Sequence, residues 1–277
     1  MILLGILLMI AAMAWLWRWL VRHEADVRLR WAEFAAHPRV TALRNRFAPQ
    51  IAFLQARLSP AEFLGLDLTI GAIILFGGVW IFGWIAEDVV TGDPLTVVDM
   101  EIAVWLHLHA TPTLTDAMKF ISLLASWPVV MGICLSMAVY FVRKRSHFRL
   151  LALILTIPVG MFLTVLLKIA FHRSRPTWDD PILMIETFGF PSGHSMAATL
   201  LYGFLAAFGV RKAQAWRWRV LTVLAAGMLI VLIGFSRLYL GVHYLSDVLA
   251  GMAAGSAWLA LCLTVVGTLQ RHRAVIR

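Results

Sequence analysis

Long apolar segments separated by shorter polar ones make up most of this chain. A hydrocarbon core about 30 Å thick requires roughly 20 consecutive apolar residues in a membrane-spanning helix. Seven segments reach or approach that length, and the fifth and sixth need flanking residues to complete a span. The predicted spans are 1–20, 67–86, 120–142, 149–170, 195–210, 220–236 and 244–268. The pattern therefore predicts an all-α, polytopic membrane helix bundle.

The longest polar stretch, residues 21–65, is divided into short segments by Pro38, Pro49 and Pro60. Arg residues alternate there with aromatic and aliphatic residues, a pattern typical of helices that lie on an anionic membrane surface. A solvated linker without a binding role fits the same pattern equally well. The sequence Ser59-Pro60-Ala61-Glu62 predicts a helix start, with Ser as the cap, Pro at the first position and Glu reaching back.

A second polar stretch, residues 88–118, contains two further proline starts, at Asp93-Pro94 and Thr111-Pro112. They predict a helix over 94–110 that lies at the membrane surface, followed by a new entry into the membrane. Four polar residues make this helix a poor span: Asp99, Glu101, His107 and His109. Its two histidines are either ligands for a lipid headgroup or simply residues of the membrane interface.

The basic residues are distributed unevenly between the two sides of the predicted bundle. The net charge is +9, yet 19 of the 24 Lys and Arg fall in segments that share one side if the spans alternate. The positive-inside rule places that side in the cytoplasm. The basic surplus is therefore a topology signal and excludes nucleic acid as the expected partner. The remaining five are Lys119, Lys168, Arg173, Arg175 and Arg237.

The N-terminal apolar segment, residues 1–17, has no Lys or Arg before it, and Arg18 and Arg22 follow it. A secretory signal peptide has a charged start and a small-residue cleavage site. We therefore expect an uncleaved anchor whose N-terminus lies outside. The predicted organisation is an anchor with a basic cytoplasmic interfacial segment over 1–65 and a membrane domain over 66–277.

The two cysteines, Cys134 and Cys262, both lie in apolar segments. This predicts free thiols and no disulfide framework. The spacing of Cys and His matches no zinc site. The sequence thus gives no sign of a zinc site.

Three polar motifs interrupt the apolar helices between residues 168 and 247. Together they contain three cations, two imidazoles, one carboxylate and a Ser-Gly turn, an inventory suited to holding a phosphate while a histidine attacks it. Ionisable residues at membrane helix ends are costly and usually functional. The motifs are Lys168-x6-Arg175-Pro176, Pro191-Ser192-Gly193-His194 and Ser236-Arg237-x5-His243-x3-Asp247.

In the first motif, the seven-residue spacing of Lys168 and Arg175 is close to two helical turns, so both can project from one helix face. Pro176 is expected to help end that helix. By itself, such a pair is also typical of cationic side chains that extend to the membrane interface. Only the other two motifs favour a functional interpretation.

The second motif directly precedes an apolar run and therefore lies at or near a helix N-terminus, where free N–H groups attract anions. Ser192 adds a hydroxyl donor, and Gly193 lets the backbone approach a phosphate oxygen closely. His194 is positioned to donate a proton to a leaving oxygen. An ordinary Ser cap next to an exposed His is the structural alternative.

In the third motif, His243 and Asp247 are four residues apart and lie on adjacent turns of one helix face. A carboxylate beside an imidazole fixes its tautomer and leaves the other ring nitrogen free as a nucleophile. Arg237, expected in the turn between two helices, has the planar fork that grips phosphate oxygens. A purely structural His–Asp pair at a helix start is the alternative.

These motifs resemble the three-part signature of the type 2 phosphatidic acid phosphatase superfamily, over residues 94–269. The resemblance implies a six-helix phosphatase core with one extra N-terminal helix and an active site at 168–247 that works without a metal. It implies that His243 forms a phosphohistidine, that Asp247 orients it and that His194 protonates the leaving group. The implied phosphate-binding residues are Lys168, Arg175, Ser192, Gly193 and Arg237. His172, Arg173 and Asp179 border this site without being part of the signature.

The expected function is therefore a metal-independent integral membrane phosphatase that hydrolyses a lipid phosphate or pyrophosphate at the outer leaflet of a bacterial inner membrane. Candidate substrates are undecaprenyl pyrophosphate, phosphatidic acid and phosphatidylglycerol phosphate. A phosphotransferase that passes the group to an acceptor lipid shares the first half-reaction and stays open. A non-catalytic lipid transporter is a further alternative, although transporters tend to show internal repeats and polar sites near the midplane.

Overall fold

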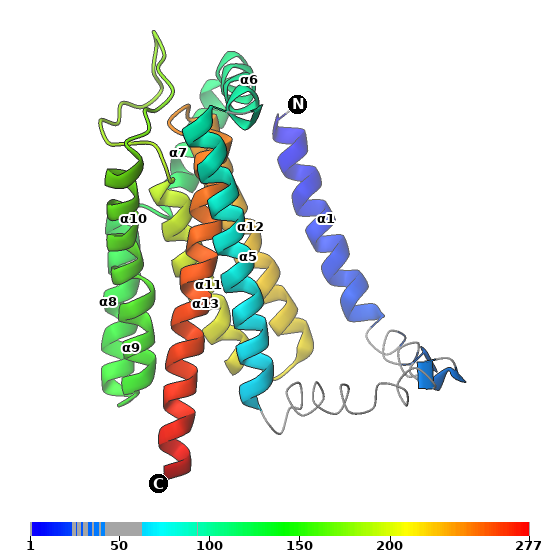
Figure 1. Cartoon of the computed structure of the whole chain (residues 1–277). Coiled ribbons are helices and arrows are strands. Elements are labelled where there is room, and N and C mark those ends of the chain that lie inside the picture. The colour runs from blue at the N-terminus through cyan, green and yellow to red at the C-terminus, as the bar shows by residue number, and fades with distance from the viewer. Residues whose placement is uncertain are drawn as a thin grey trace. The chain divides into compact units, whose positions relative to one another are not determined.

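The computed structural model describes residues 2–23, individual positions between 26 and 41, residues 63–92 and residues 94–276. All regular elements of the described residues are helices. The chain divides into two compact units, Met1–Ile70 with Gly209–Leu224, and Gly71–Phe208 with Ala225–Arg277. Figure 1 labels the helices along the chain: α1 (Ile2–Arg22), α5 (Phe63–Thr91), α6 (Pro94–Leu108), α7 (Pro112–Leu123), α8 (Trp127–Arg143), α9 (His147–Thr156), α10 (Pro158–Phe171), α11 (Gly193–Lys212), α12 (Trp216–Tyr239) and α13 (Leu245–Ile276).

Seven of the described segments are long and apolar enough to cross a membrane, which confirms the predicted all-α polytopic bundle. Two of these spans each join two helices, α7 with α8 and α9 with α10. The fifth and sixth predicted spans are completed by flanking residues, so that they run over Gly193–Lys212 and Trp216–Tyr239. Helix α6 is not among the spans, in line with the prediction from its polar residues.

The predicted helix starts are confirmed where the structure describes them. Helix α6 begins at Pro94, and α7 begins at Pro112 with Thr111 as its N-cap. Asp93, the start at 59–62 and most of the segment 21–65 lie outside the described residues. The two cysteines are free and buried, as predicted.

The first unit contains α1 and the connection between α11 and α12. Within it, the indole Nε1 of Trp17 donates to the carbonyl of Arg217 at 3.3 Å. The connection is tight, because the Nε of Arg219 donates to the carbonyl of Ala213 at 2.8 Å. It places four basic side chains at one end of these two helices: Arg211, Lys212, Arg217 and Arg219.

The second unit is organised around close contacts of α13 with its neighbours. A Cβ at Gly251 would lie 2.6 Å from the carbonyl oxygen of Ser192, and one at Gly255 would lie 2.9 Å from the Cβ of Thr199. These glycines form a Gly-x3-Gly pattern, which allows two membrane helices to approach with their backbones nearly in contact. Helix α5 uses the same device, because a Cβ at Gly78 would lie 2.9 Å from the carbonyl oxygen of Ala253.

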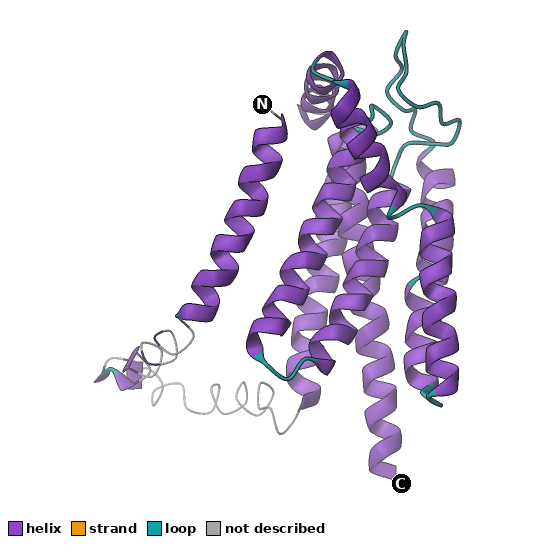
Figure 2. Cartoon of the chain, turned by 180° about the vertical axis from the view of Figure 1, so that it is seen from behind, coloured by secondary structure: helices purple, strands orange, loops and turns teal. Residues whose placement is uncertain are grey.

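The polar end of this unit is formed by three segments distant in sequence. Helix α6, the irregular segment 172–192 and the turn 240–244 lie at the same end of the helices, as both views show (Figures 1 and 2). The phenol of Tyr239 holds this end together, since it accepts from the backbone N–H of Thr111 at 2.8 Å. Beneath it, Phe190 and Ala250 are fully buried in an apolar cluster with Ile85.

The close packing of α11 against α13 predicts that one added methyl group at Gly251 lowers the stability of the folded protein. Gly251→Ala places a Cβ against a backbone oxygen that cannot move without shifting α11, and overpacking of this kind costs about 1–3 kcal/mol. Gly267→Ala, on the same helix with no neighbouring atom within 4 Å, is the matched control. We expect the midpoint of thermal unfolding in detergent to fall for the first variant and to stay level or rise for the second. Equal midpoints for both would contradict the packing argument.

Candidate active site

The three polar motifs converge at the polar end of the second unit. The first runs from the last turn of α10 into the segment 172–192, and the second forms the start of α11. The third occupies the last turn of α12, the following turn and the first turn of α13. Residues 79 positions apart are thereby brought into one cluster of hydrogen bonds, from Lys168 to Asp247.

Asp247 lies at the centre of the cluster, and its side chain is completely buried. One carboxylate oxygen accepts from the guanidinium of Arg173 at 2.6 Å. The other accepts from the backbone N–H of Tyr244 at 2.9 Å and lies 3.3 Å from Nδ1 of His243. Its backbone carbonyl accepts from the N–H of Ser192 at 2.9 Å, which joins the starts of α11 and α13.

His243 is held between an acceptor and a donor, and this fixes its tautomer. Its Nδ1 faces the Asp247 carboxylate, which only accepts, whereas its Nε2 lies 3.0 Å from the guanidinium of Arg175, which only donates. The proton therefore sits on Nδ1, and the lone pair sits on Nε2. Burial lowers the pKa of His243 to about 3 despite the opposing effect of Asp247, so the ring is neutral at physiological pH.

Arg173 links the Asp247 carboxylate to a second buried carboxylate on another helix. Its guanidinium donates to Asp247 and, at 2.8 Å, to Asp99 of α6. Burial opposes the charge of Arg173, but the two carboxylates outweigh this effect and raise its pKa. Asp99 also accepts from the backbone N–H of Ser246 at 2.8 Å and from its hydroxyl. Arg173 was expected only to border the site, and Asp99 was expected only as a polar residue of the surface helix.

The prediction that Lys168 and Arg175 share one helix face is wrong. Helix α10 ends at Phe171, because His172 adopts a left-handed conformation with φ of 46°, so Arg175 belongs to the irregular segment. The two cations still meet, since both donate to the carbonyl of Phe188. Arg175 is further fixed by the carbonyls of Thr187 and Val242, each at 2.6 Å.

The second motif lies at a helix start, as predicted, because α11 begins at Gly193. Ser192 is fully buried, and its oxygen accepts from the hydroxyl of Ser195 at 3.0 Å, which leaves its own proton available to a ligand. A Cβ at Gly193 would meet only ordinary contacts, the nearest at 3.6 Å to Lys168. The packing of the protein around Gly193 therefore leaves room for a side chain at this position. His194 is half-buried and forms no hydrogen bond with any described residue.

Arg237 lies in the last turn of α12 and not in the turn that follows, where it was expected. Its guanidinium is only 3% exposed and donates to the hydroxyl of Ser122 on α7 at 2.6 Å. Its Nε is buried without a partner among the described residues. A buried donor without an acceptor is costly, and an anion at this position would supply the missing partner.

Two aromatic rings hold the segment 172–192 over the turn before α13. The indole of Trp178 donates to the carbonyl of Gly241 at 2.9 Å and stacks on the His107 ring at 4.2 Å. His109, directly after α6, instead stacks on Trp105 in the last turn of that helix. Of the two other residues expected to border the site, His172 contacts the Phe188 ring, and Asp179 is exposed.

The resulting site is strongly cationic around a neutral imidazole. Its cations are Lys168, Arg175 and Arg237, of which Arg175 lies 3.0 Å from Nε2 of His243, and the start of α11 adds the positive end of a helix dipole. Within the described part of the chain, no three carboxylate, imidazole or thiolate side chains are grouped so as to hold a metal ion. The arrangement can bind a multiply charged anion through protein cations alone.

Comparison with known proteins places this arrangement in a family. The profile of the PAP2 superfamily matches residues 149–271, which include all three motifs. Phosphatidylglycerophosphatase B of Bacillus subtilis is 33% identical over 147 residues, which cover 52% of this chain and 71% of that protein. Undecaprenyl-diphosphatase of Sulfolobus acidocaldarius is 25% identical over 152 residues, which cover 50% of this chain and 67% of that protein.

The fold is shared with a solved member of the same family. The crystal structure of a transmembrane PAP2-type phosphatidylglycerolphosphate phosphatase from Bacillus subtilis superimposes with a TM-score of 0.64 at 27% identity. The alignment covers 72% of this chain and 97% of that one. The chain therefore belongs to the PAP2 superfamily, among its membrane lipid phosphatases.

Proposed function

We propose that the protein hydrolyses a lipid phosphate or pyrophosphate through a phosphohistidine on His243. The observation that carries this proposal is the fixed tautomer of His243. A buried, neutral imidazole presents its Nε2 lone pair within reach of Arg175, and Asp247 holds the proton on the opposite nitrogen. An imidazole in this state is ready to attack phosphorus without first losing a proton.

In the first step, Nε2 of His243 forms a bond to phosphorus while the bond from phosphorus to the lipid oxygen breaks. His194 gives a proton to the departing oxygen. The imidazole becomes cationic as the bond forms, and the Asp247 carboxylate beside Nδ1 stabilises that charge. His194 forms no hydrogen bond with any described residue, which supports its role as the mobile proton carrier.

In the second step, a water molecule attacks the phosphohistidine from the side that the leaving oxygen has vacated. His194, now neutral, accepts a proton from that water, and the bond from phosphorus to Nε2 breaks. Inorganic phosphate leaves, and both histidines return to their starting states. A phosphotransferase would use a lipid hydroxyl in place of water at this step.

The three cations Lys168, Arg175 and Arg237 supply the charge stabilisation, so the reaction proceeds without a metal ion. The Nε of Arg237, which has no partner among the described residues, and the hydroxyl proton of Ser192 both donate to equatorial phosphate oxygens. Arg175 moves its donor from His243 to the phosphate as the substrate enters, which frees the lone pair for attack. Because the protein already holds these hydrogen-bond donors in place, they need little reorganisation when negative charge develops on the phosphate in the transition state.

The substrate is a lipid of the outer leaflet. If the spans alternate across the membrane, the sequence assigns the site to the side opposite the segments that carry 19 of the 24 basic residues, and the positive-inside rule assigns those segments to the cytoplasm. The relatives named for phosphatidylglycerophosphate and undecaprenyl diphosphate make a lipid monophosphate and a lipid diphosphate the two substrate classes to test.

We further propose that residues 1–65 anchor the chain and lie on the cytoplasmic membrane surface.

The nucleophile is tested by substitution of each histidine. His243→Asn should abolish both turnover and labelling of the protein by a ³²P-labelled lipid phosphate, because no P–N bond can form. His194→Asn should still become labelled but release phosphate slower by roughly 10²–10⁴-fold, as expected for the loss of a general acid and base. His109→Asn, directly after α6, is the control and should keep full activity.

The product that carries the ³²P label distinguishes a hydrolase from a phosphotransferase, which share the first step. Inorganic phosphate should appear with EDTA present and without an acceptor lipid. Label that appears only on an added acceptor lipid would show a transferase, and turnover by His243→Asn would exclude this residue as the nucleophile.

The neutral state of His243 predicts a specific response to pH. Its folded-state pKa of about 3 lies below the ordinary 6.5, so the unfolded chain binds more protons between these values. The stability contributed by this residue is therefore present above about pH 6.5 and is lost as the pH falls toward 3. In ¹⁵N-histidine spectra of the membrane-embedded protein, the signal missing from His243→Asn should show the neutral Nδ1–H tautomer at pH 5.5. An imidazolium signal at that pH would contradict the assignment.

Arg173 and Asp99 are positioning residues in this proposal, because they hold Asp247 and do not touch the substrate. Asp99→Asn removes one charge from the buried pair with Arg173 and should lower kcat by roughly 10–100-fold with little change in KM, since the proposed effect is on the orientation of His243 through Asp247. Glu101→Gln, exposed on the same helix, is the matched control. Kinetics should be normalised to the burst of phosphoenzyme, which counts folded sites. A normalised kcat equal to that of the wild type would reduce Asp99 to a purely structural residue.

A further inference from the structure

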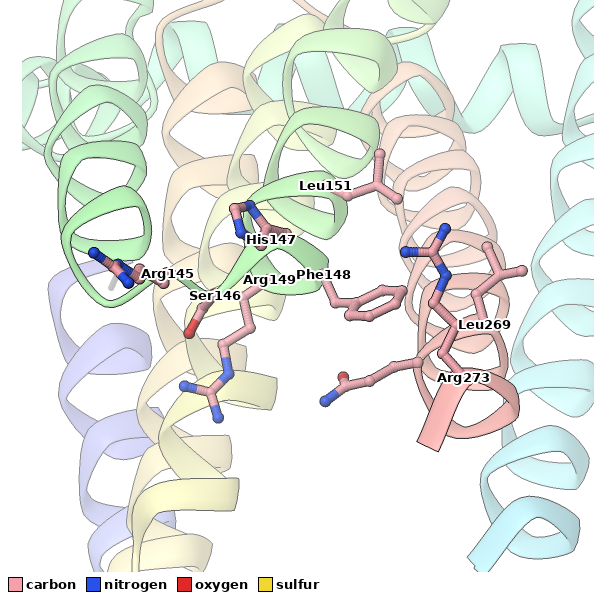
Figure 3. A pocket seen from close by; sticks show the side chains of 9 residues that line it. Arg145, Ser146, His147, Phe148, Arg149, Leu151, Leu269 and Arg273 are labelled. Atoms are coloured by element: carbon pink, nitrogen blue, oxygen red, sulfur yellow. The ribbon is translucent and has the colours of Figure 1, made fainter. Parts of the chain in front are cut away.

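A second cationic site lies at the opposite end of α13 from the candidate active site. A pocket of about 700 Å³ opens there between the turn that joins α8 to α9 and the last turns of α13. Figure 3 shows side chains from both sides of this opening, with the Phe148 ring directed from α9 toward α13. At 1.5 Å per residue, the 26 positions from Asp247 to Arg273 place it roughly 40 Å from the catalytic carboxylate.

The pocket gathers positive charge that no described residue neutralises. Its lining includes three guanidinium groups, from Arg145, Arg149 and Arg273, and contains no Asp or Glu. None of the three side chains forms an ion pair or a hydrogen bond with any other described residue. The guanidinium of Arg149 lies 5.6 Å from the centre of the Phe208 ring, and that of Arg273 lies 5.6 Å from the centre of the Phe148 ring. These cation–π contacts position two of the guanidiniums and leave their N–H groups available to a ligand.

The local backbone adds to this charge. Helix α9 begins at His147 beside the pocket, and no side chain caps its first turn, so its positive end faces the same space. Arg145 occupies a left-handed position with φ of 52°, which glycine would adopt more readily. An arginine at this position carries a conformational cost that a glycine would avoid.

The rest of the lining is apolar and lies at the level where two predicted spans end. One span begins at His147, and the other ends at Arg273. Leu151 and Leu269, one turn further into each span, are 39% and 49% exposed, so they face the hydrocarbon. The pocket thus combines a cationic rim at the membrane surface with apolar walls that continue into the bilayer.

We infer that this pocket binds the headgroup of an anionic phospholipid from the leaflet opposite the candidate active site. The lipid phosphate accepts hydrogen bonds from the arginine forks, which match phosphate geometry in pairs. The acyl chains lie along Leu151 and Leu269. Basic pockets between helix ends on the cytoplasmic side are a known mode of recognition of anionic lipid headgroups.

This occupant fits the pocket better than a soluble phosphate compound does. A soluble anion would satisfy the guanidiniums but would leave the exposed leucines without a function. A zwitterionic lipid would bring a cation into a pocket that already holds three. The lipid bridges α9 and α13, so its binding should stabilise the folded chain by mass action, independently of whether the chain is a phosphatase.

The test uses the full-length protein in a mild zwitterionic detergent. Dioleoylphosphatidylglycerol, dioleoylphosphatidylcholine and glycerol 1-phosphate are added in separate titrations. Bound lipids are counted by native mass spectrometry, and the midpoint of thermal unfolding is followed in parallel. We expect the anionic lipid alone to bind and to raise the midpoint.

The variants compare the pocket with general surface charge. Arg145→Gln combined with Arg149→Gln and Arg273→Gln should lower the affinity for the anionic lipid roughly tenfold or more. Arg211→Gln combined with Arg217→Gln and Arg219→Gln removes the same charge from another basic segment and should leave the affinity unchanged. If the first variant unfolds in the absence of lipid, Arg149→Gln alone replaces it, with Arg149→Lys as the charge-preserving comparison.

Three results would overturn the inference. Undiminished binding in the pocket variant would show that the lipid binds elsewhere, and an equal loss in the control variant would show a nonspecific attraction to positive charge. Equal stabilisation by glycerol 1-phosphate would identify a soluble phosphate as the occupant. Because the variants keep His243 and Asp247, their phosphatase activity reports separately on the proposed function.

Discussion

The buried carboxylate of Asp247 is the constraint on which the polar end of this protein depends. A charge removed from water is tolerated only when partners surround it, and breaking one such pair typically costs about 3–5 kcal/mol. Here four groups from two segments are the partners: a guanidinium from Arg173, a backbone N–H from Tyr244, the imidazole of His243 and, through the Asp247 carbonyl, the N–H of Ser192. Satisfying this one group therefore fixes the relative positions of the irregular segment and of the starts of α11 and α13, which is also what the chemistry requires.

The hydrogen bond from the N–H of Ser192 to the Asp247 carbonyl requires a close approach of α11 and α13. The glycines at 251 and 255 remove the side chains that would otherwise separate the helices next to the carbonyl of Ser192. In a membrane, where burial of apolar surface does not drive association, such contacts are a main source of helix–helix stability. The same contact therefore contributes stability and places the start of α11 beside the His243–Asp247 pair. A site built from helix ends in this way is held more rigidly than one built from loops alone.

Much of the site could be predicted from the sequence because its motifs carry their chemistry locally. The spacing of His243 and Asp247 and the helix start at Gly193 depend on a few adjacent residues. Two features could not be predicted from the motifs. The left-handed residue His172 ends α10 before Arg175, and a cation in an irregular segment leaves no periodic signal. Asp99 is distant in sequence from the residues it contacts, although it is in phase with the buried Ala103 and Leu106 of α6. A carboxylate on the apolar face of a helix indicates a buried partner, but not which one.

The two cationic sites at the ends of α13 differ in how their charges are held, and this difference suits different ligands. In the candidate active site, Lys168, Arg175 and Arg237 each donate to a protein oxygen, so their positions are set before an anion arrives. Fixed donors favour a transition state, whose charge appears only briefly and at defined atoms. The arginines of the second pocket have no polar partner among the described residues and rest at most on aromatic faces. Such side chains can adjust to headgroups of different size, at the cost of the freedom they lose on binding. Preorganised charge suits the site that carries out chemistry, and adaptable charge suits the site that holds a lipid.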